Sequence, residues 1–344
     1  MVTYFSPSIA KAVGNFPGVD FSTPVPWDRP KVFAEFLDWH QPRALLIART
    51  DTWPEMIRSA HDANIPSLLF SATLAENSGR ARGLGRWASE STLSFLTQID
   101  CVSDQDFATF SSLGLGDKTR VQGDTRYDQV IARLKNPRPI RESLFNEVSR
   151  NSCLVAGSTW EEDEAVLIDL AVSFKSATEK INFVLVPHEP TEAHLTALET
   201  RLKTQGLASV RYTQATFWKP GQVLLVDQIG ILAELYAHAR FAFVGGSFKK
   251  TVHSVMEPLA AGCVTFVGPK HLNNREALEF KKLPLGLGVT CVGTIGSAPE
   301  FSAQLRLAMK LDVKTDEKIR DEVRRRTGKT AAVIEWCAAH IDFK

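Results

Sequence analysis

The sequence lacks the marks of several large protein classes. Its five cysteines are an odd number with no CxxC pair, which argues against a disulfide framework and against a zinc site. Lys and Arg (40) balance Asp and Glu (39), so the formal charge of +1 gives no indication of a nucleic-acid partner. No apolar run approaches the roughly 18 residues of a membrane span, and the N-terminus does not resemble a signal peptide. We therefore expect a soluble protein of a reducing compartment.

Several catalytic signatures are missing as well. Gly114-Leu115-Gly116 and Gly286-Leu287-Gly288 lack the third glycine of a dinucleotide-binding GxGxxG motif. The sequence contains no GxxxxGK[ST], HExxH or GxSxG pattern. These absences disfavour kinase, dehydrogenase, zinc-enzyme and α/β-hydrolase functions.

The chain instead alternates short apolar runs with longer segments of helical period. Such alternation indicates βαβ units and parallel sheets, whose strands are apolar because both faces are covered. The predicted strands are 44–48, 67–71, 100–103, 120–122, 153–156, 183–186, 223–226, 241–244, 264–267 and 289–292. The predicted helices include 30–39, 54–63, 105–113, 161–174, 191–204, 231–238, 255–261 and 315–340.

A loop-like stretch at 134–139 divides this pattern, and 344 residues suffice for two domains. We predict an α/β fold with an N-terminal domain over 1–140, a second domain over 150–313 and a C-terminal helical segment over 314–344. Ligands in doubly wound folds bind at the carboxyl ends of the strands. The loops at those ends are therefore the places to look for a site.

The most informative loop follows the predicted strand 241–244. It opens with Gly245 and Gly246, where a backbone can approach a ligand closely, and leads to a helix predicted to start near Ser254. The N-terminus of that helix is suited to a phosphate. Glu257 could accept two ribose hydroxyls, or it could only cap the helix, since Ser254 and Glu257 have capping-box spacing.

Three further loops of the second half carry small or polar residues. Gly157-Ser158-Thr159 precedes an acidic first helical turn, in which Glu161 has capping-box spacing to Ser158. His188 follows a strand and could contact a phosphate or base, or be a packing residue. The Gly230 backbone, in the loop after 223–226, could meet the edge of a base. Parallel topology brings these loops together.

In the first half, Asp51 lies in a loop after the predicted strand 44–48, and Arg126 follows the strand 120–122. Arginine binds carboxylate or phosphate with two parallel hydrogen bonds, so Arg126 is a candidate anion-binding residue. The alternative is a surface salt bridge to Asp124 or Asp128.

Taken in order, these loops resemble the bacterial 3-deoxy-D-manno-octulosonic acid (Kdo) transferases, which move Kdo from CMP-Kdo onto a lipid A precursor in the lipopolysaccharide biosynthesis of Gram-negative bacteria. The matching stretches run over most of the chain. They are Phe5-Ser6-Pro7-Ser8, Thr52-Trp53-Pro54, 123–128, 157–164, Pro187-His188-Glu189, 227–232, 245–257 and 266–269, followed by Asn273 and Glu276.

The resemblance implies a GT-B fold, in which two Rossmann-like domains face a cleft and a C-terminal helix crosses back to the first domain. The N-terminal domain would be the acceptor side. It also implies catalytic roles for Asp51, at an acidic position, and for Arg126, which would help to stabilise the transition state. The implied CMP-sugar site comprises Ser158, Pro187, His188, Ile229, Gly230, Ile231, Gly245, Gly246, Ser254, Val255, Met256, Glu257, Asn273 and Glu276. The family needs no metal and no other cofactor.

The chain also departs from the family pattern. No Ser-Val-Gly-Glu-like stretch is present, and in the family the glutamate of that stretch acts as general base, worth about 10²–10⁴ in rate. The sequence opens almost directly on the strand-like Val2-Thr3-Tyr4-Phe5. Three explanations compete: an enzyme sequence without its first βα unit, a divergent paralogue with another donor or acceptor, and a non-catalytic nucleotide-binding homologue. We favour the transferase.

The resemblance implies two partners, a CMP-sugar donor and a lipid A precursor at the inner membrane surface. The expected location is the cytoplasm, with peripheral attachment to the inner membrane. The basic stretch 314–329 could meet an anionic membrane, or it could be a solvated helix face, since acidic residues lie among its cations.

Overall fold

The computed structural model describes residues 1–6, 16–175 and 177–341. Pro7 and Ser8 of the resemblance lie outside these ranges. The chain forms two compact units, one of Met1–Thr125 with Gly328–Lys344 and the other of Arg126–Thr327. These divisions fall at Thr125 and Gly328, whereas the sequence pattern suggested divisions near 140–150 and at 314. The first unit is called here the N-terminal unit and the second the C-terminal unit.

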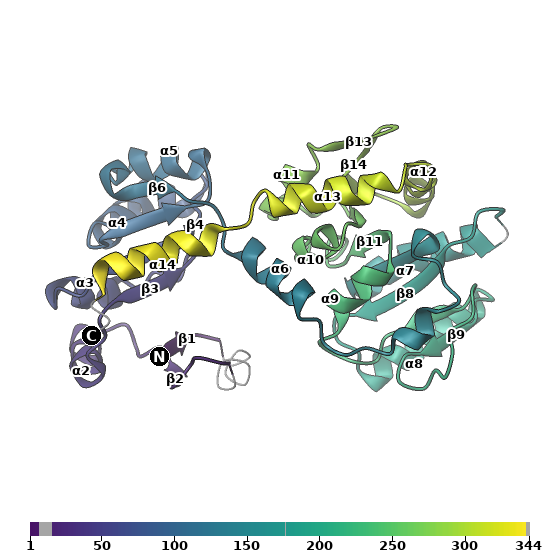
Figure 1. Ribbon diagram of the computed structural model, residues 1–344, viewed down its shortest axis with the longest axis horizontal. Helices are drawn as coiled ribbons and strands as arrows, with labels where there is room; N and C mark the ends of the chain where they lie inside the picture. The colour runs from purple at the N-terminus through teal and green to yellow at the C-terminus, as the bar shows by residue number, and fades with distance from the viewer. Residues whose placement is uncertain (7–15, 176, 342–344) are drawn as a thin grey trace. The chain divides into compact units, whose positions relative to one another are not determined.

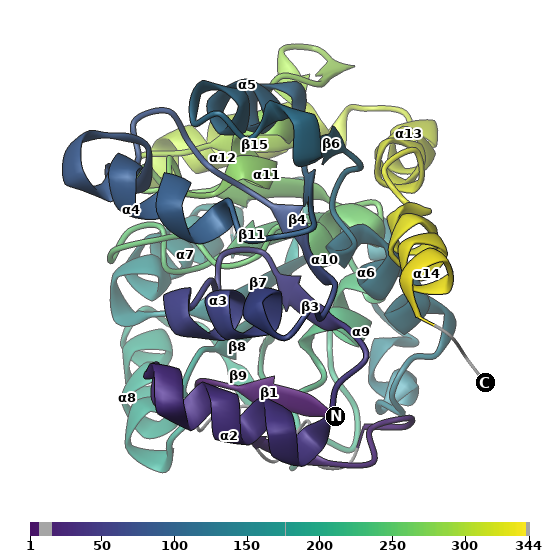
Figure 2. The ribbon, with the colours of Figure 1, turned by 90° about the vertical axis from the view of Figure 1, so that its left-hand side faces the viewer.

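The N-terminal unit contains a parallel sheet whose four described strands follow chain order, β3-β4-β5-β6. Strands β1 and β2 form a separate parallel pair. Helices α2 and α3 lie side by side, and α14 lies beside β3 (Figures 1 and 2). The elements are β1 (Val2–Tyr4), β2 (Ser22–Pro24), α2 (Pro30–His40), β3 (Leu45–Ala48), α3 (Pro54–Asp62), β4 (Ser67–Ala72), α4 (Gly83–Leu93), β5 (Gln98–Cys101), α5 (Asp104–Ser112), β6 (Thr119–Val121) and α14 (Lys329–His340).

The C-terminal unit is built on a larger parallel sheet, with the order β15-β12-β11-β7-β8-β10-β9 among the strands that the structure describes. Its elements are α6 (Arg126–Lys135), β7 (Cys153–Thr159), α7 (Glu161–Lys175), β8 (Asn182–Pro187), α8 (Glu192–Thr204), β9 (Ser209–Arg211), β10 (Val223–Leu225), α9 (Leu232–Leu235), β11 (Phe241–Val244), α10 (Met256–Ala260), β12 (Val264–Val267), α11 (Arg275–Phe280), β13 (Pro284–Gly286), β14 (Val289–Thr290), β15 (Val292–Thr294), α12 (Ala298–Met309) and α13 (Lys314–Arg324).

This strand order has a topological switch point. From β7 the chain builds the sheet outward through β8 to β10 and β9, then returns to the other side of β7 with β11 and continues to β12 and β15. The two directions diverge between β7 and β11, at the centre of the sheet. In open parallel sheets this is the place where a crevice forms beyond the carboxyl ends of the strands.

The predicted α/β fold is confirmed, and the apolar runs that predicted strands form the centres of both sheets. Residues 289–292 are divided between β14 and β15. The prediction of one helix over 315–340 is wrong. Helices α13 and α14 are separated at Gly328, whose φ of 85° lies in the left-handed region that ends helices. In the described ranges, no helix has both the length and the apolar composition needed to cross a bilayer.

A buried ionic network attaches α13 to the C-terminal unit. The Asp316 carboxylate forms an ion pair with Arg150, and its other oxygen accepts from Arg240 Nε at 3.3 Å. Arg240 Nη2 also donates to the Leu311 carbonyl oxygen at 2.7 Å. Asp316 and Arg240 are both buried, so each charge depends on the other for compensation.

We expect Asp316→Ala to lower the free energy of unfolding of the C-terminal unit by about 3–5 kcal/mol, because it leaves Arg240 buried without a counter-charge. The matched control is Asp321→Ala on the same helix, where the exposed pair with Arg324 contributes about 0.5 kcal/mol or less. Urea denaturation measures both variants. Equal stabilities would contradict a structural role for the buried network.

Candidate functional site

The loops that follow β7, β8 and β11 meet at the switch point. The His188 N–H donates to the Thr159 carbonyl oxygen at 2.9 Å, and the Gly245 N–H donates to the Gly157 carbonyl oxygen at 2.9 Å. The His253 N–H in turn donates to the Gly245 carbonyl oxygen at 3.1 Å. Backbone hydrogen bonds therefore join three of the strand-end loops that the sequence singled out.

The Asp163 carboxylate fixes two of these loops. It is fully buried and accepts hydrogen bonds from the backbone N–H groups of Gly246 (2.7 Å), Trp160 (3.0 Å) and Phe248 (3.1 Å). Burial raises the pKa of Asp163, and the three N–H bonds to the ionised carboxylate act against that rise. Asp163, not a capping box of Ser158 with Glu161, binds the backbone at the start of α7.

Close packing at the switch point requires a glycine. A Cβ atom on Gly245 would lie 2.3 Å from the Ser158 carbonyl oxygen, so any side chain would push the two loops apart. Ser158 itself has a φ of 55°, in the left-handed region that non-glycine residues rarely adopt, where the register of β7 with β8 is irregular. Strained backbone of this kind clusters at functional sites, and Ser158 stays a predicted site residue.

An aromatic and cationic cluster borders the same loops. The His188 and His253 rings stack with centroids 4.5 Å apart, and the Trp160 ring lies 4.9 Å from His188. Lys249 Nζ lies 3.3 Å from the Trp160 ring centroid. The Trp160 Nε1–H group faces His253 Nε2 at 3.4 Å, which suits an unprotonated acceptor. The cluster offers positive charge and flat surfaces to a ligand at the strand ends.

Burial, together with the neighbouring His188, lowers the pKa of His253. His253 is therefore neutral at pH 7, in keeping with the acceptor role of its Nε2 toward Trp160.

Glu257 is bound to an arginine that the sequence did not indicate. Arg133 Nη1, on α6, lies 3.3 Å from the Glu257 carboxylate, while Arg133 Nη2 donates to Glu234 and to the Gly230 carbonyl oxygen, both at 3.2 Å. Burial raises the pKa of Glu257, and the Arg133 charge acts in the opposite direction. Arg133 thus joins the two positions predicted to hold the base and the ribose.

The capping-box alternative for Glu257 is wrong. Helix α10 begins at Met256, and the Ser254 hydroxyl accepts from the Met256 N–H at 3.3 Å instead of from Glu257. With five residues α10 is also too short to provide much of a helix dipole.

The other predicted donor-site residues differ in what they can offer. Pro187, Ile231, Val255 and Met256 are buried, so their side chains belong to the core and only backbone atoms could meet a ligand. The Ile229 side chain is 82% exposed, and Asn273 and Ser254 are also exposed. Asn274, which was not predicted, donates from its amide to the His253 carbonyl oxygen at 3.0 Å.

Arg126, at the start of α6, forms an ion pair with Glu276 of α11, so the structure brings together two predicted residues. Asp51 belongs to the other unit. It is exposed and lines a pocket of about 740 Å³ together with Phe5, Trp53 and Phe70.

The site residues that the sequence did not indicate are ones whose side chains bind groups on other loops or helices. Asp163 and Asn274 act on backbone groups of loops distant in sequence, and Arg133 lies on a helix that was not predicted. A signal existed for Asp163 alone, as an acid in a first helical turn beside a strand end.

The basic segment 314–329 is largely charge-compensated. Its arginines pair with nearby acids: Arg320 and Arg324 with Glu317, Arg325 with Glu322, and Arg326 with Glu279. This arrangement favours the solvated-face alternative over a membrane-binding patch.

We expect His253 to titrate below 6.5, and His188→Gln to raise its pKa, because that variant removes the neighbouring positive charge. NMR of the histidine rings measures both values, with His253→Gln assigning the signal. A group whose pKa is lower in the folded state loses stability as the pH falls, so the native state should weaken below pH 6.5. A pKa of His253 at or above 6.5 would contradict the neutral acceptor.

Comparisons with known proteins bear on this site. Residues 1–129 match the family model described as 3-deoxy-D-manno-octulosonic-acid transferase (kdotransferase). The chain is 27% identical to a 3-deoxy-D-manno-octulosonic acid transferase of Bordetella pertussis over 325 residues, which cover 92% of this chain and 70% of the relative. It is 26% identical to that of Haemophilus influenzae, over 90% of this chain and 72% of the relative.

The fold is similar to that of UDP-GlcNAc 2-epimerase from Neisseria meningitidis, with a TM-score of 0.61, 13% identity, and coverage of 94% of this chain and 91% of the other. At this identity the likeness concerns the fold alone, and it supports assignment of the chain to the GT-B class. The family model covers residues 1–129, and the two relatives extend the similarity over about nine tenths of the chain. The chain is therefore similar to the Kdo transferases over most of its length.

Proposed function

We propose that this protein transfers Kdo from CMP-Kdo to a lipid A precursor in lipopolysaccharide biosynthesis. The observation that carries the proposal is the gathering of the family's motif loops at the β7/β11 switch point, where parallel sheets bind nucleotides. Its relatives over most of the chain are named for this transfer, so a purely binding role is not favoured.

The C-terminal unit would hold the donor. Glu257 would accept the ribose hydroxyls, with the cytosine edge near the Gly230 backbone, since Arg133 connects these two positions. The phosphate and the Kdo carboxylate carry negative charge, and Lys249 and His188 lie at the same strand ends. We propose that these groups bind the donor without a metal ion.

In the reaction, an acceptor hydroxyl oxygen forms a bond to the anomeric carbon of Kdo while the bond from that carbon to the CMP phosphate oxygen breaks. The hydroxyl proton passes to a base, and CMP leaves with the bonding electrons. Arg126 would stabilise the negative charge that develops on the leaving phosphate. Its ion pair with Glu276 holds the guanidinium in place before the donor binds. Asp51 remains the predicted acidic residue of the acceptor side, and the acceptor would be met at the cytoplasmic face of the inner membrane.

We expect transfer of labelled Kdo from CMP-Kdo to a lipid A precursor, and Arg126→Ala should lower kcat about 10²-fold or more, because it removes a charge-stabilising group from the transition state. Arg325→Ala is the matched control, since this arginine is exposed on α13 and pairs with Glu322. Absence of transfer by the unaltered chain would contradict the proposal. Equal rates for the two variants would contradict the role of Arg126.

We expect Glu257→Gln to weaken CMP binding about tenfold or more, because a carboxylate that accepts ribose hydroxyls is replaced by a neutral amide. Isothermal calorimetry measures the dissociation constant, and Glu335→Gln, an exposed change in the N-terminal unit, is the control. Unchanged affinity in Glu257→Gln would place the ribose elsewhere.

A further inference from the structure

The N-terminal unit contains a second, smaller pocket that the donor site does not involve. It has a volume of about 210 Å³, equal to roughly seven molecules of liquid water, and lies beyond the carboxyl ends of β3 and β4. Its walls come from the loop Arg49–Thr52, the end of β4 and one side of α4. It therefore occupies the edge of a parallel sheet at which ligands bind.

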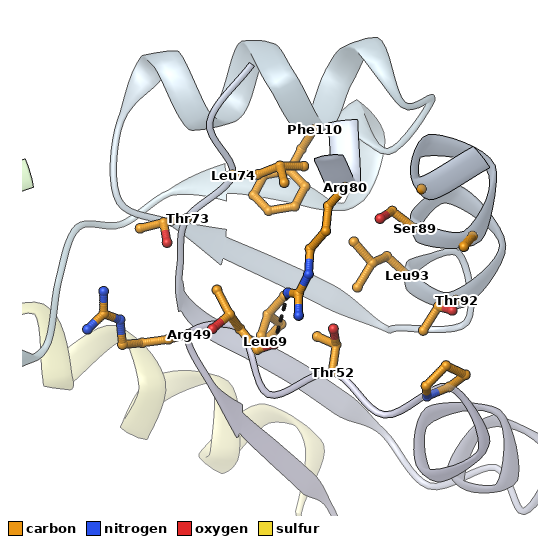
Figure 3. Close-up of a pocket in the computed structure, with 14 residues that line it drawn as sticks. Arg49, Thr52, Leu69, Thr73, Leu74, Arg80, Ser89, Thr92, Leu93 and Phe110 are labelled. Carbon is orange, nitrogen blue, oxygen red and sulfur yellow. Dashed lines mark hydrogen bonds between the residues drawn. The ribbon is translucent and has the colours of Figure 1, made fainter. Parts of the chain in front are cut away.

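Arg80 dominates the chemistry of this pocket. Figure 3 shows its side chain extending into the pocket, with the guanidinium beside Thr52 and Leu69. One nitrogen, Nη1, donates to the Thr50 carbonyl oxygen at 3.0 Å, which anchors the group and leaves further N–H donors for a ligand. Arg49 lies at the opposite side, and its side chain extends away from Arg80.

The pocket is positive and rich in hydroxyls. No Asp or Glu is among the described residues that line it, and none of the ion pairs in the described part of the chain involves Arg49 or Arg80. The hydroxyl-bearing lining residues are Thr50, Thr52, Thr73, Ser89 and Thr92. An arginine fork without a carboxylate partner, among hydroxyl donors, is suited to a tetrahedral oxyanion.

We propose that this pocket binds a phosphate group of the acceptor, with Arg80 as its principal ligand. The choice of ligand rests on the proposed function, since a lipid A precursor is a phosphorylated glucosamine disaccharide. The acceptor is thereby held through its phosphate on the N-terminal unit, and its sugar hydroxyl is presented from a fixed anchor. Arg80 acts as a specificity residue that selects phosphorylated over unphosphorylated disaccharides.

The test is calorimetric binding, without donor, of a deacylated glucosamine disaccharide bisphosphate and of its dephosphorylated counterpart. We expect Arg80→Gln to weaken binding of the bisphosphate about tenfold or more, through loss of a charge-assisted hydrogen bond. Arg82→Gln is the matched control, because Arg82 does not line the pocket and donates to the Glu76 carbonyl oxygen. Circular dichroism checks that each variant folds.

A second pair of variants fills the pocket without removing charge. Ser89→Leu on α4 should weaken bisphosphate binding, whereas Ser91→Leu, exposed on the same helix and outside the pocket, should not. Bisphosphate affinity that is the same in Arg80→Gln and Arg82→Gln, or equal affinity for the dephosphorylated disaccharide, would overturn the inference. Arg80-dependent binding without transfer from CMP-Kdo would uphold the pocket and refute the proposed function instead.

Discussion

The candidate donor site depends on one buried carboxylate. Asp163 accepts hydrogen bonds from three backbone N–H groups. One belongs to Trp160, in the loop after β7, and the other two belong to Gly246 and Phe248, which lie 83 and 85 residues further along the chain in the loop after β11. An ionised carboxylate is stable in such a place only when hydrogen-bond donors surround it. Two of these bonds hold the glycine loop after β11, and the absence of a side chain on Gly245 allows that loop to pack against the Ser158 backbone. The aromatic and histidine cluster follows from that arrangement.

Arg133 plays the corresponding part on the other side of the site. Its guanidinium donates hydrogen bonds to Glu257, Glu234 and the Gly230 carbonyl oxygen. One cation therefore fixes the position of the Glu257 carboxylate relative to the loop that contains Gly230. A ribose that binds Glu257 would meet a carboxylate already oriented, which reduces the ordering that binding requires. Arg80 in the N-terminal unit is positioned in a similar way. One of its nitrogens donates to the Thr50 carbonyl oxygen, and its other N–H groups can bind a ligand.

Much of the fold could be predicted because buried parallel strands are apolar along their whole length, as 153–156 and 241–244 are. The short edge strand β9 was missed because three residues give too little pattern. Helices α4 and α6 were missed although α6 has a clear apolar face. The site loops could be located because the carboxyl ends of parallel strands converge. The contacts that side chains make between these loops could not be predicted. The bond from Asn274 to His253 and the pairing of Arg133 with Glu257 join residues distant in sequence, and no local spacing encodes them.

The central claim is that the switch-point site of the C-terminal unit recognises a cytidine nucleotide. Calorimetry of the unaltered chain with CMP, UDP and ADP under one set of conditions tests it most directly. The account predicts that CMP binds with the lowest dissociation constant, and that UDP and ADP bind at least about tenfold more weakly, the effect of one unpaired polar group in the base pocket. Equal binding of the three nucleotides, or no binding of any of them, would contradict it.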